Sequence, residues 1–350
     1  MTAHIKVSGT WKEINSEKVK VSGVWKDVSQ GWVKVNGSWK LFHNPSISTS
    51  YSGIVSGPTM PFLYMRAFAS DGENFYAVKD ESPYNKLYKS IGGGPWYLHA
   101  TMSTGSVING SYNTSLAYGN GVLVSNSGYY STDGGTTWNN SPSAIRPTNY
   151  NNVYFSNGKF FGSVANTNQG TGGVVSNDGI NWTFYSGNAA NGTSYLQLFS
   201  KIVFTGQKYV CVAGGSISHS TDLVNWTAST GYVPGFGTGQ PGFDVNSTGT
   251  IVYSDATNNR IVTSTDHGVT FTNQSVAYTP YGVVYANGYW IVLPGTSSRT
   301  LKWSTNGTSW TDVANAVPAG ELWNNGIAYA KNLGKWMASS GINAVTILSV

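Results

Sequence analysis

The sequence predicts an all-β protein: a seven-bladed β-propeller, with six blades as the alternative, preceded by a small module of β-hairpin repeats. Three observations lead to this fold class. The composition favours strands and turns, with 43 Gly, 22 Tyr and 13 Trp in 350 residues. A short repeat occupies the N-terminus, and a longer repeat fills the rest of the chain. Repeats of roughly 40–45 residues are typical of propeller blades.

Charge and cysteine content narrow the class of protein. Only 10% of the residues are charged, and the arginines (Arg66, Arg146, Arg260 and Arg299) are scattered, so we expect no nucleic-acid partner. Cys211 is the single cysteine, which excludes an internal disulfide. No apolar run is long enough to cross a membrane, and the first residues lack the apolar core of a signal peptide. We therefore expect no signal peptide and no membrane insertion.

Residues 1–43 contain three similar segments, IKVSGTWKEI, VKVSGVWKDV and VKVNGSWKLF. Their tryptophans, Trp11, Trp25 and Trp39, recur every 14 residues. Each unit has two β runs around a Ser-Gly or Asn-Gly turn, which predicts a hairpin. A core this small is marginal, so we expect an attachment module that needs a partner surface or further copies of itself, as in a homo-oligomer.

Residues 44–59 are expected to form a linker. Within it, the stretch Ser46–Ser56 is a candidate strand that closes the ring. The last blade needs such a strand because the chain ends where its outermost strand would begin.

Residues 60–350 repeat two signals. The first is a β run, a turn with glycine and a second β run, as in AYGNGVLV and VYANGYWIV. The turn glycines are Gly72, Gly121, Gly158, Gly206, Gly249, Gly288 and Gly334. The second signal is a shorter turn that closes on an aromatic residue: STDGGTTW, SNDGINW, STDLVNW, STDHGVTF and STNGTSW, with a degraded copy, SIGGGPW. One pair of signals predicts one blade of four strands.

The second signal resembles the Asp-box, the bacterial-neuraminidase repeat of sialidase-like propellers. Asn306 in place of Asp, Phe271 in place of Trp, and Leu223 and Val224 near the usual glycine depart from that pattern. Independently of the family, these aspartates can accept hydrogen bonds from their own turn, and the aromatics can pack between repeats. We therefore assign them structural roles: Asp133, Trp138, Asp178, Trp182, Asp222, Trp226, Asp266, Phe271, Asn306 and Trp310.

The candidate ligand site lies on the opposite side of the ring. The glycine turns and the Asp-boxes share one face, so the loops between blades gather on the other. These loops are rich in Tyr, Asn, Ser and Gly, which is typical of recognition surfaces. The candidate ligand-binding residues are Tyr97, His99, Tyr112, Arg146, Tyr150, Tyr195, Tyr232, Phe236, Tyr278, Tyr281 and Trp323. Aromatic rings with amide and hydroxyl donors suit a glycan.

We expect no enzyme activity, no cofactor and no metal. The resemblance to sialidases would imply three arginines around a carboxylate, a Tyr–Glu pair and an acidic residue. Arg66 stands in YMRAFAS, which does not match the family's first arginine motif. The five histidines are scattered, without the spacing of metal ligands.

The N-terminal repeats resemble those of structural and receptor-binding proteins of tailed bacteriophages. This resemblance implies a virion protein of the tail, attached to other virion proteins through residues 1–43. It also implies synthesis in the host cytoplasm without a signal peptide. The propeller would then display a face that binds a host-surface glycan or receptor. Two alternatives remain: a purely structural virion decoration or spacer, and a sialidase-like glycoside hydrolase.

Overall fold

The structure is a computed structural model in which every described element is a strand. It describes these residues: strands between His4 and Ser52, 65–79, 85–102, 116–143, Pro147, 153–166, 170–185, 201–213, 216–232, 242–295, 300–313, 323–340 and 344–349. The chain divides into two compact units, Met1–Ser50 with Leu348–Val350, and Tyr51–Ile347.

The first unit contains three separate two-stranded hairpins. They are β1 (His4–Val7) with β2 (Thr10–Glu13), β3 (Lys18–Val21) with β4 (Val24–Asp27), and β5 (Gly31–Val35) with β6 (Ser38–His43). Trp11, Trp25 and Trp39 lie in β2, β4 and β6, opposite Lys6, Lys20 and Lys34. The hairpin in each repeat follows from its Ser-Gly or Asn-Gly turn between two β runs.

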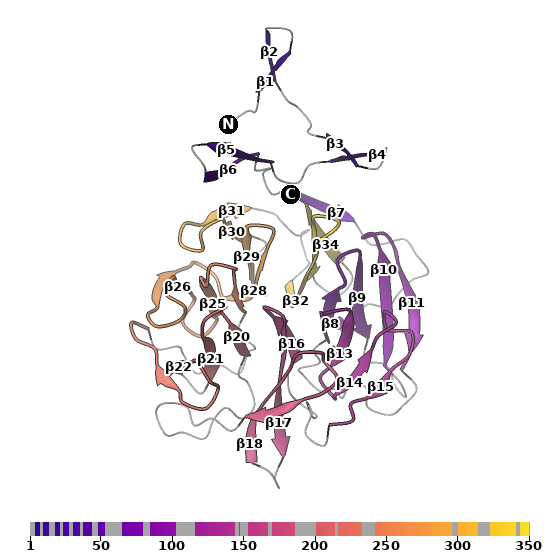
Figure 1. The fold of residues 1–350 in the computed structure, drawn as a ribbon, viewed down its shortest axis with the longest axis vertical. Helices are drawn as coiled ribbons and strands as arrows, with labels where there is room; N and C mark the ends of the chain where they lie inside the picture. Colours follow the sequence, from indigo (N-terminus) through magenta and orange to yellow (C-terminus); the bar gives the residue numbers. More distant parts are fainter. Residues whose placement is uncertain are drawn as a thin grey trace. The chain divides into compact units, whose positions relative to one another are not determined.

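The second unit is a β-propeller, and Figure 1 shows its sheets. Six blades each consist of four antiparallel strands that are consecutive in the chain, so that each strand pairs with the next. The first three are blade 1, β8 (Met65–Ser70), β9 (Asn74–Lys79), β10 (Lys86–Ile91) and β11 (Trp96–Thr101); blade 2, β12 (Leu116–Gly119), β13 (Val122–Ser125), β14 (Tyr129–Ser131) and β15 (Asn139–Asn140); and blade 3, β16 (Val153–Ser156), β17 (Lys159–Asn166), β18 (Gly170–Ser176) and β19 (Thr183–Tyr185).

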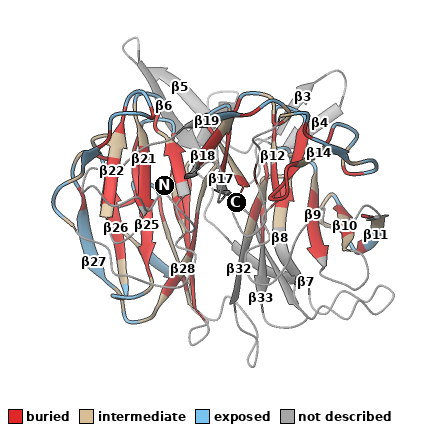
Figure 2. Cartoon of the chain, turned by 90° about the horizontal axis from the view of Figure 1, so that it is seen from below, coloured by how far each residue is buried: buried red, intermediate tan, exposed pale blue. Residues whose placement is uncertain are grey.

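The next three blades follow the same order. They are blade 4, β20 (Lys201–Phe204), β21 (Tyr209–Ala213), β22 (Ser216–Ser220) and β23 (Thr227–Ala228); blade 5, β24 (Phe243–Val245), β25 (Ile251–Asp255), β26 (Arg260–Ser264) and β27 (Thr272–Ser275); and blade 6, β28 (Pro280–Ala286), β29 (Tyr289–Pro294), β30 (Leu301–Ser304) and β31 (Thr311–Val313). Strands near the edge are exposed while strands inside are buried, as β27 and β25 show in Figure 2.

A further sheet combines β32 (Trp323–Ala330), β33 (Lys335–Ser340), β34 (Ala344–Ser349) and β7 (Ser48–Ser52), in that order. The strand β7 lies within the stretch 46–56 that was expected to donate a closing strand. The prediction of an all-β propeller is confirmed. Seven blades were expected, with six as the alternative; six blades are complete within consecutive strands, and this composite sheet stands beside them.

The core of the propeller lies between neighbouring blades. One cluster joins Leu123 of blade 2 to Tyr76 and Leu87 of blade 1, and another joins Val252 of blade 5 to Trp290 of blade 6. Phe75 and Trp96 of blade 1 pack against Met337 of β33, so apolar side chains also link the first blade to the composite sheet. Burying large rings at each interface stabilises the ring by the hydrophobic effect.

Two faces of the propeller follow from this strand order. We call the face with the connections between first and second and between third and fourth strands the turn face, and the opposite face the loop face. Asn120 Nδ2, in the first turn of blade 2, donates to the carbonyl oxygens of Gly158 and Asn177 at 3.2 and 2.8 Å. These two partners belong to the two turn types of blade 3, which therefore lie together on the turn face.

Candidate functional site

Five turns with the pattern Ser-x-Asp, or Ser-x-Asn in blade 6, connect the third and fourth strands of blades 2 to 6. The turn of blade 3 shows the arrangement. Asp178 Oδ1 accepts the Ser176 hydroxyl and the backbone N–H groups of Ile180 and Asn181, each at 2.8 Å. Asp178 Oδ2 accepts Asn181 Nδ2 at 2.8 Å. Both carboxylate oxygens are therefore used within the turn itself.

The other four turns repeat this network. Ser hydroxyls lie 2.7–3.0 Å from the side-chain oxygen of Asp133, Asp222, Asp266 or Asn306. Asn306 Oδ1 accepts the N–H groups of Thr308 and Ser309 at 2.9 and 2.8 Å, which explains why Asn can replace Asp. One side-chain oxygen is sufficient to hold the turn.

The protonation of these aspartates follows from the same contacts. Burial alone would raise the pKa of Asp133 and Asp178, but hydrogen bonds outweigh it and lower the pKa of each to about 2. The donors are Thr137 and Ser131 for Asp133, and Asn181, Ile180 and Ser176 for Asp178. Hydrogen bonds from Asn225 and Val224 lower the pKa of Asp222, and the pKa of Asp266 is lowered as well. A carboxylate with so low a pKa is a poor proton donor near neutral pH.

The aromatic residues that close these turns lie between blades. Phe271 is 2% exposed, and Trp182 and Trp226 are also buried. Trp138 and Trp310 are partly buried against the same kind of interface. Trp138 Nε1 and Trp226 Nε1 donate to the carbonyl oxygens of Gly135 and Leu223, at 3.0 and 3.2 Å. Each ring fills the space next to the preceding blade, and those of Trp138 and Trp226 also hold their own turns through these hydrogen bonds.

Two of the predicted loop residues lie elsewhere. Tyr97 and His99 belong to the outer strand β11, which continues to Thr101, and not to a loop between blades. His99 Nε2 lies 3.0 Å from the carbonyl oxygen of Gly134, in the Ser-x-Asp turn of blade 2, so it is on the turn face. Burial and the charge of Lys89 lower the pKa of His99, so the neutral ring donates its Nε2–H to that carbonyl. The strand extends further than expected because its pairing with β10 continues past a bulge at Leu87.

Three predicted residues do lie on the loop face. Tyr232 donates its hydroxyl to Asp255 Oδ2 at 2.6 Å, and the Arg260 guanidinium lies 6.0 Å from its ring centre. The carbonyl oxygen of Tyr281 accepts the Ser254 hydroxyl at 2.6 Å. The hydroxyl of Tyr278 is buried and has no hydrogen-bond partner among the described residues. The contact of Tyr232 joins the loop after blade 4 to blade 5, and the contact of Tyr281 joins the start of strand β28 in blade 6 to blade 5.

The loop at 254–259 offers no free carboxylate. Asp255 is 1% exposed, and its Oδ1 accepts the N–H groups of Thr257 and Asn258 at 3.0 and 3.1 Å. Its Oδ2 accepts Asn258 Nδ2 and the Tyr232 hydroxyl. In the described part of the chain, no group of His, Cys, Asp or Glu has the arrangement of a metal site.

The remaining predicted residues lie outside the described residues, or their side chains do. Trp323 begins strand β32, and only its backbone is described. The side chains of Trp11, Trp25 and Trp39 are outside as well. The same holds for Tyr112, Arg146, Tyr150, Tyr195 and Phe236, which therefore stay predictions.

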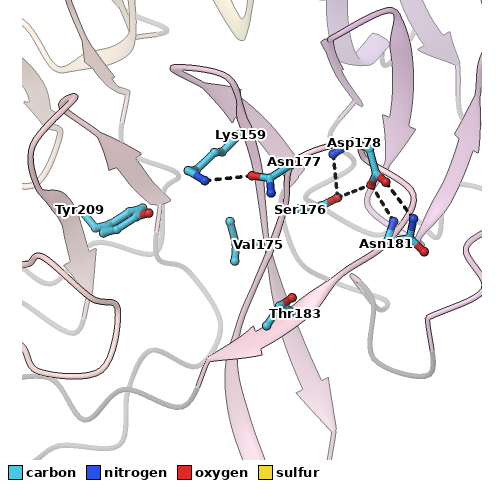
Figure 3. Close-up of a pocket in the computed structure, with 8 residues that line it drawn as sticks. All are labelled: Lys159, Val175, Ser176, Asn177, Asp178, Asn181, Thr183 and Tyr209. Atoms are coloured by element: carbon cyan, nitrogen blue, oxygen red, sulfur yellow. Dashed lines mark hydrogen bonds between the residues drawn. The ribbon is translucent and has the colours of Figure 1, made fainter.

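Sequence reasoning missed a cavity on the turn face, between blades 3 and 4. Its volume is about 320 Å³. Figure 3 shows Tyr209 of blade 4 beside Lys159 of blade 3, with Val175 and Thr183 below Lys159 in this view. Lys159 Nζ donates to Asn177 Oδ1 at 2.9 Å. The lining residues are Lys159, Val175, Ser176, Asn177, Asp178, Asn181, Thr183 and Tyr209. They come from four strands of two blades and from one turn, so no local sequence motif predicts the cavity.

No protein-family model and no curated protein sequence matches this chain. Similar solved structures include YCF48 bound to D1 peptide, with a TM-score of 0.58, 12% identity, and coverage of 88% of this chain and 98% of that chain. A catalytically inactive variant of virginiamycin B lyase from Staphylococcus aureus with quinupristin has a TM-score of 0.61 at 10% identity, with coverage of 87% and 100%. The WD40 β-propeller domain of Doa1 has a TM-score of 0.56 at 14% identity, with coverage of 86% and 97%.

At such low identity these similarities show the fold alone: the chain folds as a β-propeller. The described residues contain no helix long and apolar enough to cross a membrane.

Proposed function

We propose that this chain is a tail protein of a bacteriophage virion, whose propeller binds a glycan on the host surface without cleaving it. The N-terminal hairpins attach the protein to other virion proteins, and further copies of the chain can assemble through them. The setting in a virion is supported by the resemblance of residues 1–43 to tail-protein repeats. The likeness of the Ser-x-Asp turns to the Asp-box supports a relationship to sialidase-like propellers in architecture.

The absence of cleavage is supported by one observation above all: the Ser-x-Asp carboxylates accept hydrogen bonds from their own turns. Asp178, for example, accepts from Ser176, Ile180 and Asn181. Such a group is neither a nucleophile nor a proton donor for an incoming sugar. Asp255, buried on the loop face, is likewise engaged by Tyr232 and by its own loop.

Arginine placement points the same way. Among the arginines, the structure describes the side chain of Arg260 alone. Its guanidinium donates to Asn273 Oδ1 on the outer strand of blade 5. A sialidase would need arginines that converge on one carboxylate. A side chain committed to the edge of a blade does not supply such a clamp.

The experiment is a glycan array probed with the full-length protein, followed by product analysis after long incubation with each bound polysaccharide. Binding without new reducing ends supports the proposal. Release of saccharide would favour a glycoside hydrolase, and an array without binding would favour a structural decoration or spacer.

Attachment is tested separately by removing residues 1–45. The truncated chain should be absent from assembled virions yet keep the thermal transition of the propeller. If it entered virions at the normal copy number, the attachment role of the hairpins would be wrong.

A further inference from the structure

The interface between blades 3 and 4, which we call the 3–4 seam, is less filled than the equivalent interfaces. The residue that pairs with the serine of each Ser-x-Asp turn shows this. In blades 2, 3, 5 and 6 it is completely buried, whereas Tyr209 in blade 4 is only partly buried. The five residues are Leu123, Phe160, Tyr209, Ile251 and Trp290.

A second position contributes to the gap. The residue just before the serine of the turn faces the following blade, and it is large in blades 2, 4 and 6. Tyr130, His219 and Trp303 stand there, whereas blades 3 and 5 have the smaller Val175 and Thr263. Thr263 still reaches the next blade, because its hydroxyl donates to the Gly307 carbonyl oxygen at 2.7 Å, but the apolar Val175 has no donor. A smaller side chain at one position leaves unfilled volume when the neighbouring blade does not move in.

The turn of blade 4 confirms that the seam is wide. In four turns, the N–H that donates to the serine hydroxyl belongs to a glycine, but in blade 4 it belongs to Leu223, at φ 65°. A Cβ on Gly179 would lie 2.7 Å from Val124 Cγ2, and one on Gly268 would lie 2.4 Å from Val210 Cγ2. The 3–4 seam instead accommodates the whole Leu223 side chain, 8% exposed.

The spacing of the inner strands, which are the first strands of each blade, also indicates a wide 3–4 seam. Successive inner strands of the other described blades make close contacts, whereas β16 and β20 have few. They are joined instead by side chains, with Tyr154 and Ser156 accepting backbone N–H groups of Ile202 and Phe204. The seam is therefore open at the turn face, where the cavity lies.

The chemistry of the cavity is polar with one cation. Lys159 has three N–H donors, of which one goes to Asn177, and no described acid pairs with it. Asp178 is turned into its own turn, as Figure 3 shows, so its negative charge is already compensated by N–H donors. Thr183 and Tyr209 add hydroxyl groups to the wall.

The size limits the ligand. Pockets for small ligands measure roughly 300–1,000 Å³. A cavity of about 320 Å³ is at the lower end, which suits a single sugar unit and not a long chain buried along its length.

We propose that this cavity on the 3–4 seam binds one carboxylate-bearing sugar unit of the hexuronate class. Its carboxylate accepts from the ammonium of Lys159, and its hydroxyls bond to Asn177, Thr183 and the hydroxyl of Tyr209. The inference rests on the proposed glycan recognition and adds a subsite on the turn face, away from the predicted loop residues. A neutral sugar would lack the charge-assisted hydrogen bond to Lys159, so it should bind more weakly than the acidic sugar.

The test is isothermal titration calorimetry of the full-length protein with trigalacturonate, galacturonate and neutral trigalactose. The trimer and the monomer should both bind, and trigalactose should bind at least tenfold more weakly. Equal affinity for trimer and monomer points to one occupied subsite, as proposed. Equal affinity for trigalactose and trigalacturonate, or no binding of either acidic ligand at millimolar concentration, would overturn the proposal.

Two variants test the location. V175W fills the cavity with the residue that blade 6 carries at this position, and should abolish binding. K159M should weaken binding of trigalacturonate at least tenfold and leave trigalactose unchanged. K208M is the matched control, because Lys208 precedes Tyr209 but is not part of the cavity wall, and it should bind as the unaltered protein does.

Each variant is first checked by its thermal transition; if V175W fails to fold, K159M decides. Wild-type affinity in K159M would refute the assignment. The outcome is separable from that of the proposed function. Array binding by the unaltered protein together with unchanged trigalacturonate affinity in K159M would refute the subsite alone. An array without binding together with acid-specific binding in the calorimeter that K159M weakens would refute the loop-face role alone.

Discussion

Leu223 allows a sharp test of the wide 3–4 seam, because glycine should be tolerated there better than alanine. The L223A variant removes a buried side chain, which lowers the free energy of unfolding by about 2–5 kcal/mol for Leu to Ala in general. It also keeps a residue with a Cβ at φ 65°. A left-handed conformation costs such a residue roughly 1–2 kcal/mol.

The L223G variant loses the same packing but relieves that strain. Part of the gain is offset by the larger backbone entropy of glycine in the unfolded chain, about 0.5–1 kcal/mol. We therefore expect L223A to lose about 3 kcal/mol and L223G about 2 kcal/mol. Trp226 Nε1 bonds to the Leu223 carbonyl, which both variants retain.

The matched change is G179A in blade 3. A new Cβ there would lie 2.7 Å from Val124 Cγ2 at φ 74°, so strain and overpacking add, and we expect a loss of about 2–4 kcal/mol. Urea denaturation followed by tryptophan fluorescence measures all three. The reasoning is refuted if L223G is as unstable as L223A or more so, or if G179A is neutral.

Three further predictions concern the same framework. F271A should lower the free energy of unfolding by about 3–5 kcal/mol, because removing a ring that is 2% exposed leaves a cavity between blades. The control V224A changes an exposed side chain and should stay within about 0.5 kcal/mol of the unaltered protein. A small effect of F271A would contradict its role in filling the interface. Y232F should lower the free energy of unfolding by about 1–3 kcal/mol, because the buried Asp255 carboxylate loses a hydrogen-bond donor. Y97F is the control and should leave the free energy of unfolding nearly unchanged. Equal stability of the two variants would disprove this role of Tyr232. The pKa of Asp133 and of Asp178 is lowered to about 2 in the folded protein. The stabilisation that these carboxylates provide is therefore present above their pKa in the unfolded chain and is lost as the pH falls through the folded value. The melting temperature should hold from pH 7 to about 5 and then fall towards pH 2. The D133N/D178N double variant should flatten that fall, and an unchanged profile would count against the turn hydrogen bonds as its cause.

Local patterns in the sequence predicted the parts of the fold that local contacts determine. The hydrogen bonds that close the turn around Asp178 join residues within five positions of one another, so the local sequence is sufficient to predict this turn. The same is true of the Asn-Gly turns, where Asn120 and Asn157 adopt the positive φ that their residue type tolerates. The structural role assigned to Asp178 follows from the same short range.

Features that depend on distant residues were not predictable. His99 was assigned to a loop because the length of β11 depends on pairing with β10, which the sequence of β11 does not encode alone. The cavity is lined by Val175 and Tyr209, which come from two neighbouring blades and lie far apart in the sequence. Leu223 was visible as a departure from the repeat, but only the neighbouring blade shows that the departure reflects available space.

The glycan array combined with product analysis tests the central claim most directly. The account predicts that full-length protein retains specific host-surface polysaccharides, and that prolonged incubation generates no new reducing ends. Steady release of saccharide would contradict the account, because the protein would then cleave its ligand although the carboxylates of the Ser-x-Asp turns are engaged in structural hydrogen bonds.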